Sequence, residues 1–264
     1  MRIEGSEIVI HATAIIDPTA RLGAGVQVGP YSVIGPDVEI GENTWIASHV
    51  VINGPTRIGR DCKIYQFNSI GDHPQDKKYA GEATRLEIGD RNVIRECCTI
   101  NRGTVQDRGV TSIGNDNWIM AYVHIAHDCV VGNNTIFANN ASLAGHVIID
   151  DYVILGGFSL VHQFCHIGPH AFTGMGAAVS MDVPPYVTVA GHMAKPHGLN
   201  SEGLRRRGMS AETLRTLKQA YKTLYRSGNT LEQAIAKLEP VALECPEVAV
   251  FVEFLRNVTR GIVR

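Results

Sequence analysis

The 264-residue sequence lacks several features that would point to common classes of protein. It has no excess of basic residues, because 24 Lys and Arg oppose 26 Asp and Glu and leave a net charge of −2. Nucleic-acid-binding domains usually carry a basic patch and a pI above about 9, so DNA or RNA is not expected as a partner. No stretch reaches the roughly 18 uninterrupted apolar residues of a membrane-spanning helix, and stable membrane insertion is not expected either.

Cysteine is present, but without the spacing of a disulfide framework or a zinc site. The six cysteines form no Cys-x-x-Cys pair and no ladder of metal-ligand spacing. They are therefore interpreted as free thiols of a reducing compartment. The first residues, MRIEGSEIVI, also lack the charged segment and apolar run of a signal peptide. We expect a cytoplasmic protein.

The sequence does contain a repeat of six residues. An aliphatic residue recurs at every sixth position from Ile10 to Ile70, glycine often follows it, and the position four residues after it is usually small. This hexapeptide repeat is typical of short strands wound into a parallel β-helix. Three repeats make a triangular coil of 18 residues, and successive coils lie about 4.8 Å apart.

Two interruptions of the repeat predict loops that leave the β-helix. The repeat stops after Ile70 and returns at Ile88, so residues near 72–85 form the first loop. A slip of one residue later in the repeat marks the second loop, near 102–111. The repeat then continues as far as Val179.

The pattern changes after Pro184 and Pro185. Ser210 and Thr230 precede two segments with apolar residues at helical spacing, and residues 246–261 suggest a third helix. The predicted fold is mainly β: a β-helix domain over 1–190 and a small C-terminal α-helical domain over 191–264.

Histidines gather on one part of the predicted β-helix. Because one coil is 18 residues, His127, Gly145 and Gln163 fall in one column, with His146 beside it. His124 and His127 flank the inward Ile125, so both are expected at the surface. A lone outward histidine is usually solvated, but His162 also lies within a coil or two, and the group is a candidate site.

This group could be a metal site, a site with a covalent nucleophile or a site with a general base. Neutral imidazole suits zinc, but the column alternates His with Gly and Gln and Asp128 is expected to point elsewhere, so no metal is expected. Ser142 is a possible nucleophile, although no base is placed beside it. The thiols four residues after a repeat residue are expected to be buried and inert; they are Cys62, Cys98, Cys129 and Cys165.

A general base is the third interpretation. An unperturbed imidazole titrates near pH 6.5, so His127 can accept a proton from an attacking hydroxyl. Gly145, one coil above, has no side chain to cover its N–H, which is left to stabilise an oxyanion. This pair predicts acyl transfer.

Seven motifs and the C-terminal tail resemble one known family along the whole chain. The motifs are IYQFNSIGDHPQDKKYAGEATRLEIGD, RGTVQDRGVTSIG, HIAHDC, ANNASLAGHV, GGFSLVHQFCHIG, DVPPYV and NSEGLRRRG, followed by the ending TRGIVR. In this order they resemble the UDP-N-acetylglucosamine O-acyltransferases that begin lipid A synthesis. The resemblance implies a left-handed β-helix and a homotrimer with sites between subunits.

The resemblance also implies a reaction and its residues. An (R)-3-hydroxyacyl group passes from acyl carrier protein to the glucosamine 3-hydroxyl of UDP-N-acetylglucosamine, with no cofactor. His127 is the general base and Gly145 the oxyanion donor. The substrate-binding residues are Gln75, Asp76 and Lys78 for the sugar-phosphate side, His124, His146, His162 and Gln163 for the nucleotide sugar or acyl-phosphopantetheine, and Asn200, Glu202, Arg206 and Arg207 for the uridine diphosphate.

The chain departs from the family pattern at two places. Asn101 stands where members commonly carry a histidine before Arg-Gly-Thr, so the contact of that histidine is not carried over. Met175 stands where some members have glycine, in the groove that measures acyl length. It predicts a medium-length donor of the 3-hydroxydecanoyl type.

Other functions on the same scaffold stay open at this point. They are another hexapeptide acyltransferase that acts on an amine or uses coenzyme A, a zinc-dependent hydratase, and a purely structural trimer.

Overall fold

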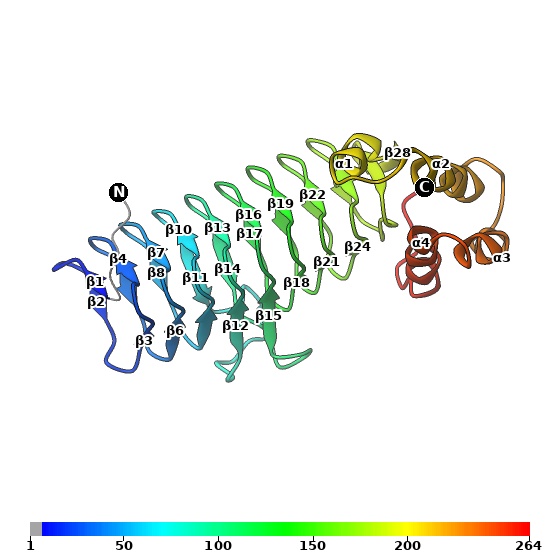
Figure 1. Ribbon diagram of the computed structural model, residues 1–264. Coiled ribbons are helices and arrows are strands. Elements are labelled where there is room, and N and C mark those ends of the chain that lie inside the picture. Colours follow the sequence, from blue (N-terminus) through cyan, green and yellow to red (C-terminus); the bar gives the residue numbers. More distant parts are fainter. Residues whose placement is uncertain (1–6) are drawn as a thin grey trace.

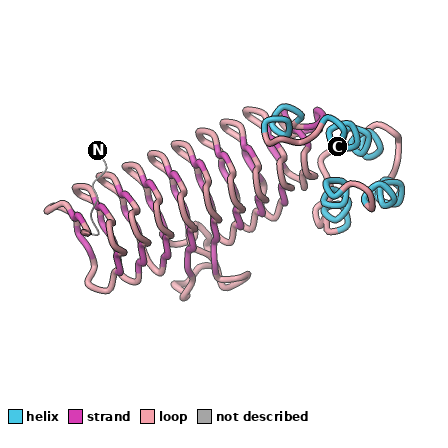
Figure 2. Tube along the Cα trace, viewed as in Figure 1, coloured by secondary structure: helices cyan, strands magenta, loops and turns pink. Residues whose placement is uncertain are grey.

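Short strands follow one another along the chain and wind into a three-sided rod, with a group of helices at its C-terminal end (Figures 1 and 2). This computed structural model describes residues 7–264. The strands form three sheets, one on each side of the rod. All neighbouring strands are parallel except β27 and β28.

The sheets are named A, B and C, and their strands are given in spatial order. Sheet A has 11 strands: β1 (Val9–Ile10), β4 (Gln27–Val28), β7 (Trp45–Ile46), β10 (Lys63–Ile64), β13 (Val93–Ile94), β16 (Trp118–Ile119), β19 (Ile136–Phe137), β22 (Ile154–Leu155), β25 (Phe172–Thr173), β27 (Val187–Ala190) and β28 (Lys195–Leu199). Sheet B has nine: β2 (Ile15–Ile16), β5 (Val33–Ile34), β8 (Val51–Ile52), β11 (Ser69–Asp72), β14 (Thr99–Asn101), β17 (His124–Ile125), β20 (Ser142–Leu143), β23 (Leu160–Val161) and β26 (Ala178–Val179). Sheet C has eight: β24 (His166–Ile167), β21 (Ile148–Ile149), β18 (Val130–Val131), β15 (Val110–Ile113), β12 (Arg85–Ile88), β9 (Thr56–Ile58), β6 (Val38–Ile40) and β3 (Arg21–Leu22).

The six-residue repeat forms the core of the rod. Every repeat residue from Val28 to Val179 is at most 3% exposed, including the polar Thr173, whose hydroxyl lies 2.6 Å from that of Ser159. Ile10 is 44% exposed, because it belongs to the first coil and only one neighbour covers it. Burial of a continuous aliphatic stack therefore stabilises the rod, and its end coil gains least.

The corners of the rod share one backbone conformation. The third residue after each repeat residue commonly has a positive φ, as at Asn43, Asp116, Asp128 and His146. Asn and Asp tolerate this left-handed region better than most residues. Since corners in successive coils lie above one another, side chains such as those of His146 and Phe164 stack, with ring centroids 4.4 Å apart.

Both loops leave the rod at the corner between sheets B and C. Residues 73–84 connect β11 to β12, and residues 102–109 connect β14 to β15. Paired residues in regular coils are 18 positions apart, whereas Lys63 pairs with Val93 and Val93 with Trp118 across the coils that carry the insertions. The core register resumes after each loop because a repeat residue, Ile88 or Ile113, is again buried in the core.

Four helices follow the last strand. They are α1 (Ser201–Arg206), α2 (Ala211–Tyr225), α3 (Leu231–Ala242) and α4 (Pro246–Arg256). Ser210 and Thr230 cap α2 and α3, as their positions predict, and Thr230 forms a capping box with Gln233. The short α1 was not expected, and strand β28 lies beyond residue 190. None of the helices in residues 7–264 is long and apolar enough to cross a membrane.

Truncation of a central core side chain tests how the rod is stabilised. Phe137 is fully buried in β19, so Phe137→Ala should lower the free energy of unfolding by about 3–5 kcal/mol through lost burial and a cavity. Denaturant titration measures this change. Leu243→Ala is the control, because Leu243 is 89% exposed and such a change should cost less than about 0.5 kcal/mol. Equal losses in the two variants would contradict the account of the core.

Candidate active site

Two of the predicted histidines, His127 and His146, meet at the corner between sheets B and C. His127 follows β17 and His146 follows β20, and their rings form an edge-to-face pair with centroids 5.0 Å apart. The backbone N–H of His146 donates to the carbonyl of His127 at 3.0 Å. The 18-residue coil thus brings residues of neighbouring turns into contact, as the sequence spacing predicts.

The environment of His127 differs from the prediction in one respect. Asp128 was expected to point elsewhere, but its Oδ2 lies 2.9 Å from Nδ1 of His127. The positive φ of Asp128 at the corner turns its carboxylate back toward the preceding ring. Because a carboxylate only accepts, Nδ1 carries the proton and Nε2 is left with a lone pair.

The carboxylate of Asp128 is fully buried and accepts further hydrogen bonds. The backbone N–H of Thr104 donates at 2.9 Å and the Thr104 hydroxyl at 2.6 Å. Burial alone would raise the pKa of Asp128, but the hydrogen bonds from His127 and Thr104 outweigh burial and hold the pKa below its usual value. Asp128 is therefore ionised and can stabilise a positive charge on His127.

Gly145 lies against the His127 ring. A Cβ atom added to Gly145 would lie 2.6 Å from Cε1 of His127, so any side chain here would displace the imidazole. The amide N–H of Gly145 donates no hydrogen bond to another residue within 7–264. The column of His127 and Gly145 thus combines a base with an amide donor that is free for a ligand.

His124 is positioned separately, on the outward face of sheet B. Its Nδ1 lies 2.7 Å from the Thr99 hydroxyl. Burial, assisted by repulsion from His127, lowers the pKa of His124. A neutral His124 is suited to hydrogen bonding rather than to ion pairing. Ser142 pairs with His124 across β17 and β20, but its hydroxyl bonds to the Asn140 carbonyl at 3.4 Å, not to a base.

An apolar groove begins beside His124. It has a volume of about 370 Å³ and runs over the outward face of sheet B, with Leu160, Ala178 and Met193 in its lining. His162 lines it as well, whereas Gln163 is exposed at the corner. Met175 is 82% exposed and lies at the corner that precedes β26, outside the lining of the groove in a single chain.

The first loop carries the other residues expected near the sugar. Gln75 and Lys78 are exposed, and Asp76 accepts the backbone N–H of Lys78 at 3.0 Å. Asn101 holds the base of this loop, since its side-chain N–H donates to the His73 carbonyl at 2.8 Å. Asn101 is thus a buried structural contact.

The residues expected to bind the nucleotide lie elsewhere in the chain, on α1 and its ends. Asn200 caps α1 and donates to the carbonyl of His170, at the corner between sheets C and A. The guanidinium of Arg207 lies 4.2 Å from the centroid of the Tyr152 ring at the same corner. Glu202 pairs with Arg206 at 3.2 Å on the exposed side of α1. One chain therefore does not bring this group to the corner that carries His127.

The cysteines agree with the structural interpretation. All six are free, and Cys62, Cys98, Cys129 and Cys165 are buried. Burial raises the pKa of Cys98 and of Cys129 to about 12. These thiols stay protonated and are poor nucleophiles.

A possible metal site coincides with the histidine pair. His127, Asp128 and His146 each place one ligand atom within 4.8 Å of the others. In residues 7–264, however, the Asp128 oxygens are occupied by Thr104 and His127, and His146 Nδ1 lies 2.8 Å from Asp107. Internal hydrogen bonds already occupy the Asp128 carboxylate and the Nδ1 atoms of both histidines, and the absence of a bound metal stays a prediction.

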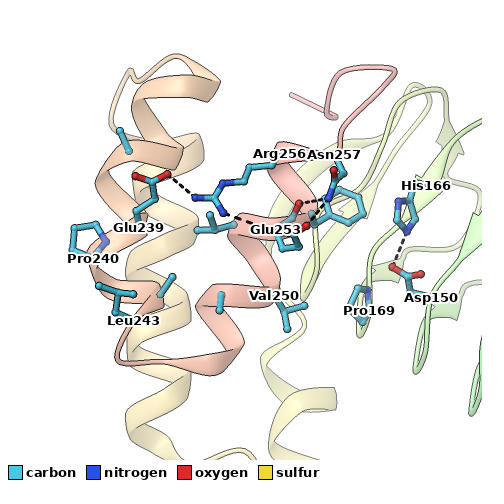
Figure 3. Close-up of a pocket in the computed structure, with 15 residues that line it drawn as sticks. Asp150, His166, Pro169, Glu239, Pro240, Leu243, Val250, Glu253, Arg256 and Asn257 are labelled. Carbon is cyan, nitrogen blue, oxygen red and sulfur yellow. Dashed lines mark hydrogen bonds and ion pairs between the residues drawn. The ribbon is translucent and has the colours of Figure 1, made fainter.

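A larger groove lies away from these residues (Figure 3). It has a volume of about 1010 Å³ between α3, α4 and sheet C. Its polar groups are already paired: His166 with Asp150 at 2.7 Å, and Arg256 with Glu239 at 2.7 Å. None of the predicted site residues lines this groove.

Comparison with known proteins identifies the family. The family model described as UDP-N-acetylglucosamine O-acyltransferase, domain 2, matches residues 182–263, and the bacterial hexapeptide transferase model matches 37–68 and 111–145. The acyl-[acyl-carrier-protein]–UDP-N-acetylglucosamine O-acyltransferase of Thiobacillus denitrificans is 62% identical over 255 residues, 97% of this chain and 99% of the relative. The chain belongs to this acyltransferase family.

Solved structures agree with membership of the UDP-N-acetylglucosamine O-acyltransferase family. The Francisella novicida enzyme is 44% identical and superimposes with a TM-score of 0.95 over 97% of this chain and 94% of that one. The Moraxella catarrhalis enzyme is 48% identical, with a TM-score of 0.94 over 97% and 99%. The family fold is a left-handed β-helix with a few C-terminal helices, which confirms the expected fold class.

His170, whose carbonyl accepts a hydrogen bond from the α1 cap residue Asn200, is predicted to make stability depend on pH. Burial, with repulsion from Arg207, lowers the pKa of His170 to about 4, below the value of about 6.5 for a free histidine. As the pH falls from about 6.5 toward 4, the unfolded chain takes up a proton that the folded chain refuses, and stability is lost. His170→Phe should keep the stacking on Tyr152 but lose less Tm between pH 7 and pH 5 than the unsubstituted protein.

The exposed His197 provides the control for this measurement. His197→Phe should leave the pH dependence of the Tm unchanged. A His170→Phe curve that runs parallel to that of the unsubstituted protein would contradict the role of His170.

Proposed function

We propose that this protein transfers an (R)-3-hydroxyacyl group from acyl carrier protein to the 3-hydroxyl of UDP-N-acetylglucosamine, the first step of lipid A synthesis. The observation that carries the proposal is the arrangement at the corner between sheets B and C. There an imidazole with its Nδ1 on a buried carboxylate lies against a glycine whose amide is free.

His127 acts as the general base in this reaction. Its Nε2 takes the proton of the sugar hydroxyl as the oxygen attacks the thioester carbonyl carbon. Asp128 keeps the imidazole in the tautomer that has a lone pair on Nε2 and stabilises the imidazolium that forms. The proton then passes to the departing phosphopantetheine thiol, so the step balances without a cofactor.

The tetrahedral intermediate carries a negative charge on the former carbonyl oxygen. The N–H of Gly145 is the donor for this oxyanion, since it has no other acceptor among the described residues. The same glycine lets the His127 ring approach closely. Base and donor are therefore adjacent in neighbouring coils.

The apolar groove on sheet B receives the acyl chain. It starts at His124 and is lined almost entirely by aliphatic and small residues, ending toward Met193. Met175, on the corner beside β26, limits the space between neighbouring subunits and sets a preference for a 3-hydroxydecanoyl-type donor. The remaining histidines, His146 and His162, with Gln163, hold the nucleotide sugar or the phosphopantetheine arm.

A homotrimer completes the site. The residues for the uridine diphosphate contact the corner between sheets C and A, whereas His127 lies at the corner between B and C. Apolar side chains are also exposed on two sides of the rod and on the corner between them, as at Trp118 on sheet A, Leu160 on sheet B and Phe158 at the corner. In the trimer, sheet A of one subunit packs on sheet B of the next and covers these side chains. The same packing brings the residues for the uridine diphosphate of one subunit close to His127 of its neighbour.

The anionic nucleotide sugar fits the remaining charged groups. Arg206, the last residue of α1, and Arg207, its C-cap, are exposed and bind the diphosphate through paired hydrogen bonds. Lys78, exposed on the first loop, approaches the sugar-phosphate side from one subunit. The six free thiols favour a cytoplasmic location, where acyl carrier protein and nucleotide sugar are both available.

An assay with purified protein, UDP-N-acetylglucosamine and a series of acyl carrier protein thioesters tests the proposal directly. His127→Ala should lower kcat by about 10²- to 10⁴-fold, the share of general-base catalysis. His11→Ala, on the exposed first coil, should leave the rate unchanged. Near-normal turnover of His127→Ala would reject the base, and transfer only to a 3-amino sugar would make the protein an N-acyltransferase.

The choice of donor tests the role of Met175. Met175→Gly should shift the preferred donor toward longer chains, because removal of the side chain frees space for several methylenes. Met175→Leu, which keeps a similar volume, should retain the original preference. If the unsubstituted protein, Met175→Gly and Met175→Leu all prefer the same donor, the assignment of Met175 to acyl length is contradicted.

A further inference from the structure

The carboxylate beside the proposed base is held from outside its own coil. Thr104 lies in the second loop, residues 102–109, and is 1% exposed. Its backbone N–H reaches both oxygens of Asp128, at 2.9 and 3.0 Å, and its hydroxyl reaches Oδ2 at 2.6 Å. The same Oδ2 accepts from His127. A loop residue thus makes most of the contacts that fix the orientation of this carboxylate.

We propose that Thr104 is a positioning residue for catalysis, and that loop 102–109 aligns the base as well as connecting two strands. The inference rests on the proposed function of His127. The Thr104 hydroxyl donates a hydrogen bond to Oδ2, which stabilises the negative charge there and restricts rotation of the carboxylate about its Cβ–Cγ bond. Asp128 then presents Oδ2 to Nδ1 of His127, and Nε2 faces the sugar hydroxyl in the right tautomer.

The second histidine of the site is held by the same loop. Asp107 accepts from Nδ1 of His146 at 2.8 Å. One face of the His146 ring stacks on Phe164, with an interplanar angle of 11°. One insertion of eight residues between β14 and β15 therefore helps to orient both imidazoles, His127 through Asp128 and His146 through Asp107.

The loop is rigid enough for this role because its base is anchored. Arg102 is 7% exposed, and its guanidinium donates to the Gly54 carbonyl and to the Tyr79 hydroxyl in the first loop. Gly103 passes so close to β15 that an added Cβ would lie 2.2 Å from the Val110 nitrogen. The chain around Thr104 is therefore confined on both sides, and the Thr104 hydroxyl has little freedom to turn away from Asp128.

A Thr104→Val substitution removes the hydroxyl and keeps the side-chain shape and the backbone N–H. We expect kcat to fall about 10- to 100-fold, the range for loss of a partner that orients a functional side chain, while KM for both substrates stays within about twofold. The acid limb of the pH profile should move to higher pH, because a carboxylate with one donor fewer attracts a protonated imidazole more strongly. Thr104→Ser, which keeps the hydroxyl, should restore most of the rate.

Thr135 offers a matched control within the rod. It is equally buried, and its N–H and hydroxyl both donate to one acceptor, Oδ1 of Asn117, at 2.8 and 2.7 Å. Thr135→Val should lower the Tm as much as Thr104→Val does but leave kcat and the pH profile unchanged. The two variants separate a loss of packing from a loss of alignment.

The outcomes separate the inference from the function on which it rests. If the unsubstituted protein transfers the acyl group, His127→Ala does not, and Thr104→Val matches Thr135→Val per folded molecule, the positioning role is wrong. If Thr104→Ser is as slow as Thr104→Val, the hydroxyl is not the active group and the role is also wrong. If the unsubstituted protein lacks transferase activity with every donor, it is the proposed function that fails.

Discussion

Closure of the coil at 18 residues is the constraint on which the rest of the structure depends. Each turn hydrogen-bonds to the next in parallel register, and the aliphatic repeat residue of each strand must point to the axis. A shift of one residue would turn every core side chain outward. Insertions are therefore tolerated only at corners, and residues 18 apart are held in contact. That contact places His127 against Gly145 and His146.

The candidate site combines the regular coils of the β-helix with the two inserted loops. The corner between sheets B and C carries both inserted loops, His127 and His146. Asp128 uses the left-handed corner conformation to reach its own neighbour, and Thr104 reaches it from the loop. The rod sets the spacing between His127 and Gly145, and the second loop holds the side chains of Asp128 and His146. The residues of α1 and its ends that are expected to bind the nucleotide lie at another corner, between sheets C and A.

The features of the regular coils could be predicted from the sequence, whereas those of the corners and loops could not. The column of His127 and Gly145, the buried cysteines and the capped helices came from periodicity and local signals, because the repeat spacing fixes which residues share a face. Asp128 was placed wrongly because adjacent residues in a strand point to opposite sides, and the turn at the corner breaks that rule. Short α1 carries too few residues to show a helical period.

The sequence by itself determined the β-helix, its coil length and the column that holds His127 and Gly145, since a six-residue repeat that resumes after each interruption leaves one register that buries the aliphatic repeat residues. Only the tertiary structure decided the partners of these residues. The contacts of Thr104 with Asp128, of Asp107 with His146 and of Arg102 with Tyr79 join segments whose separation in sequence has no period. Loops fold back according to local sterics and hydrogen-bond satisfaction, and no repeat encodes their path.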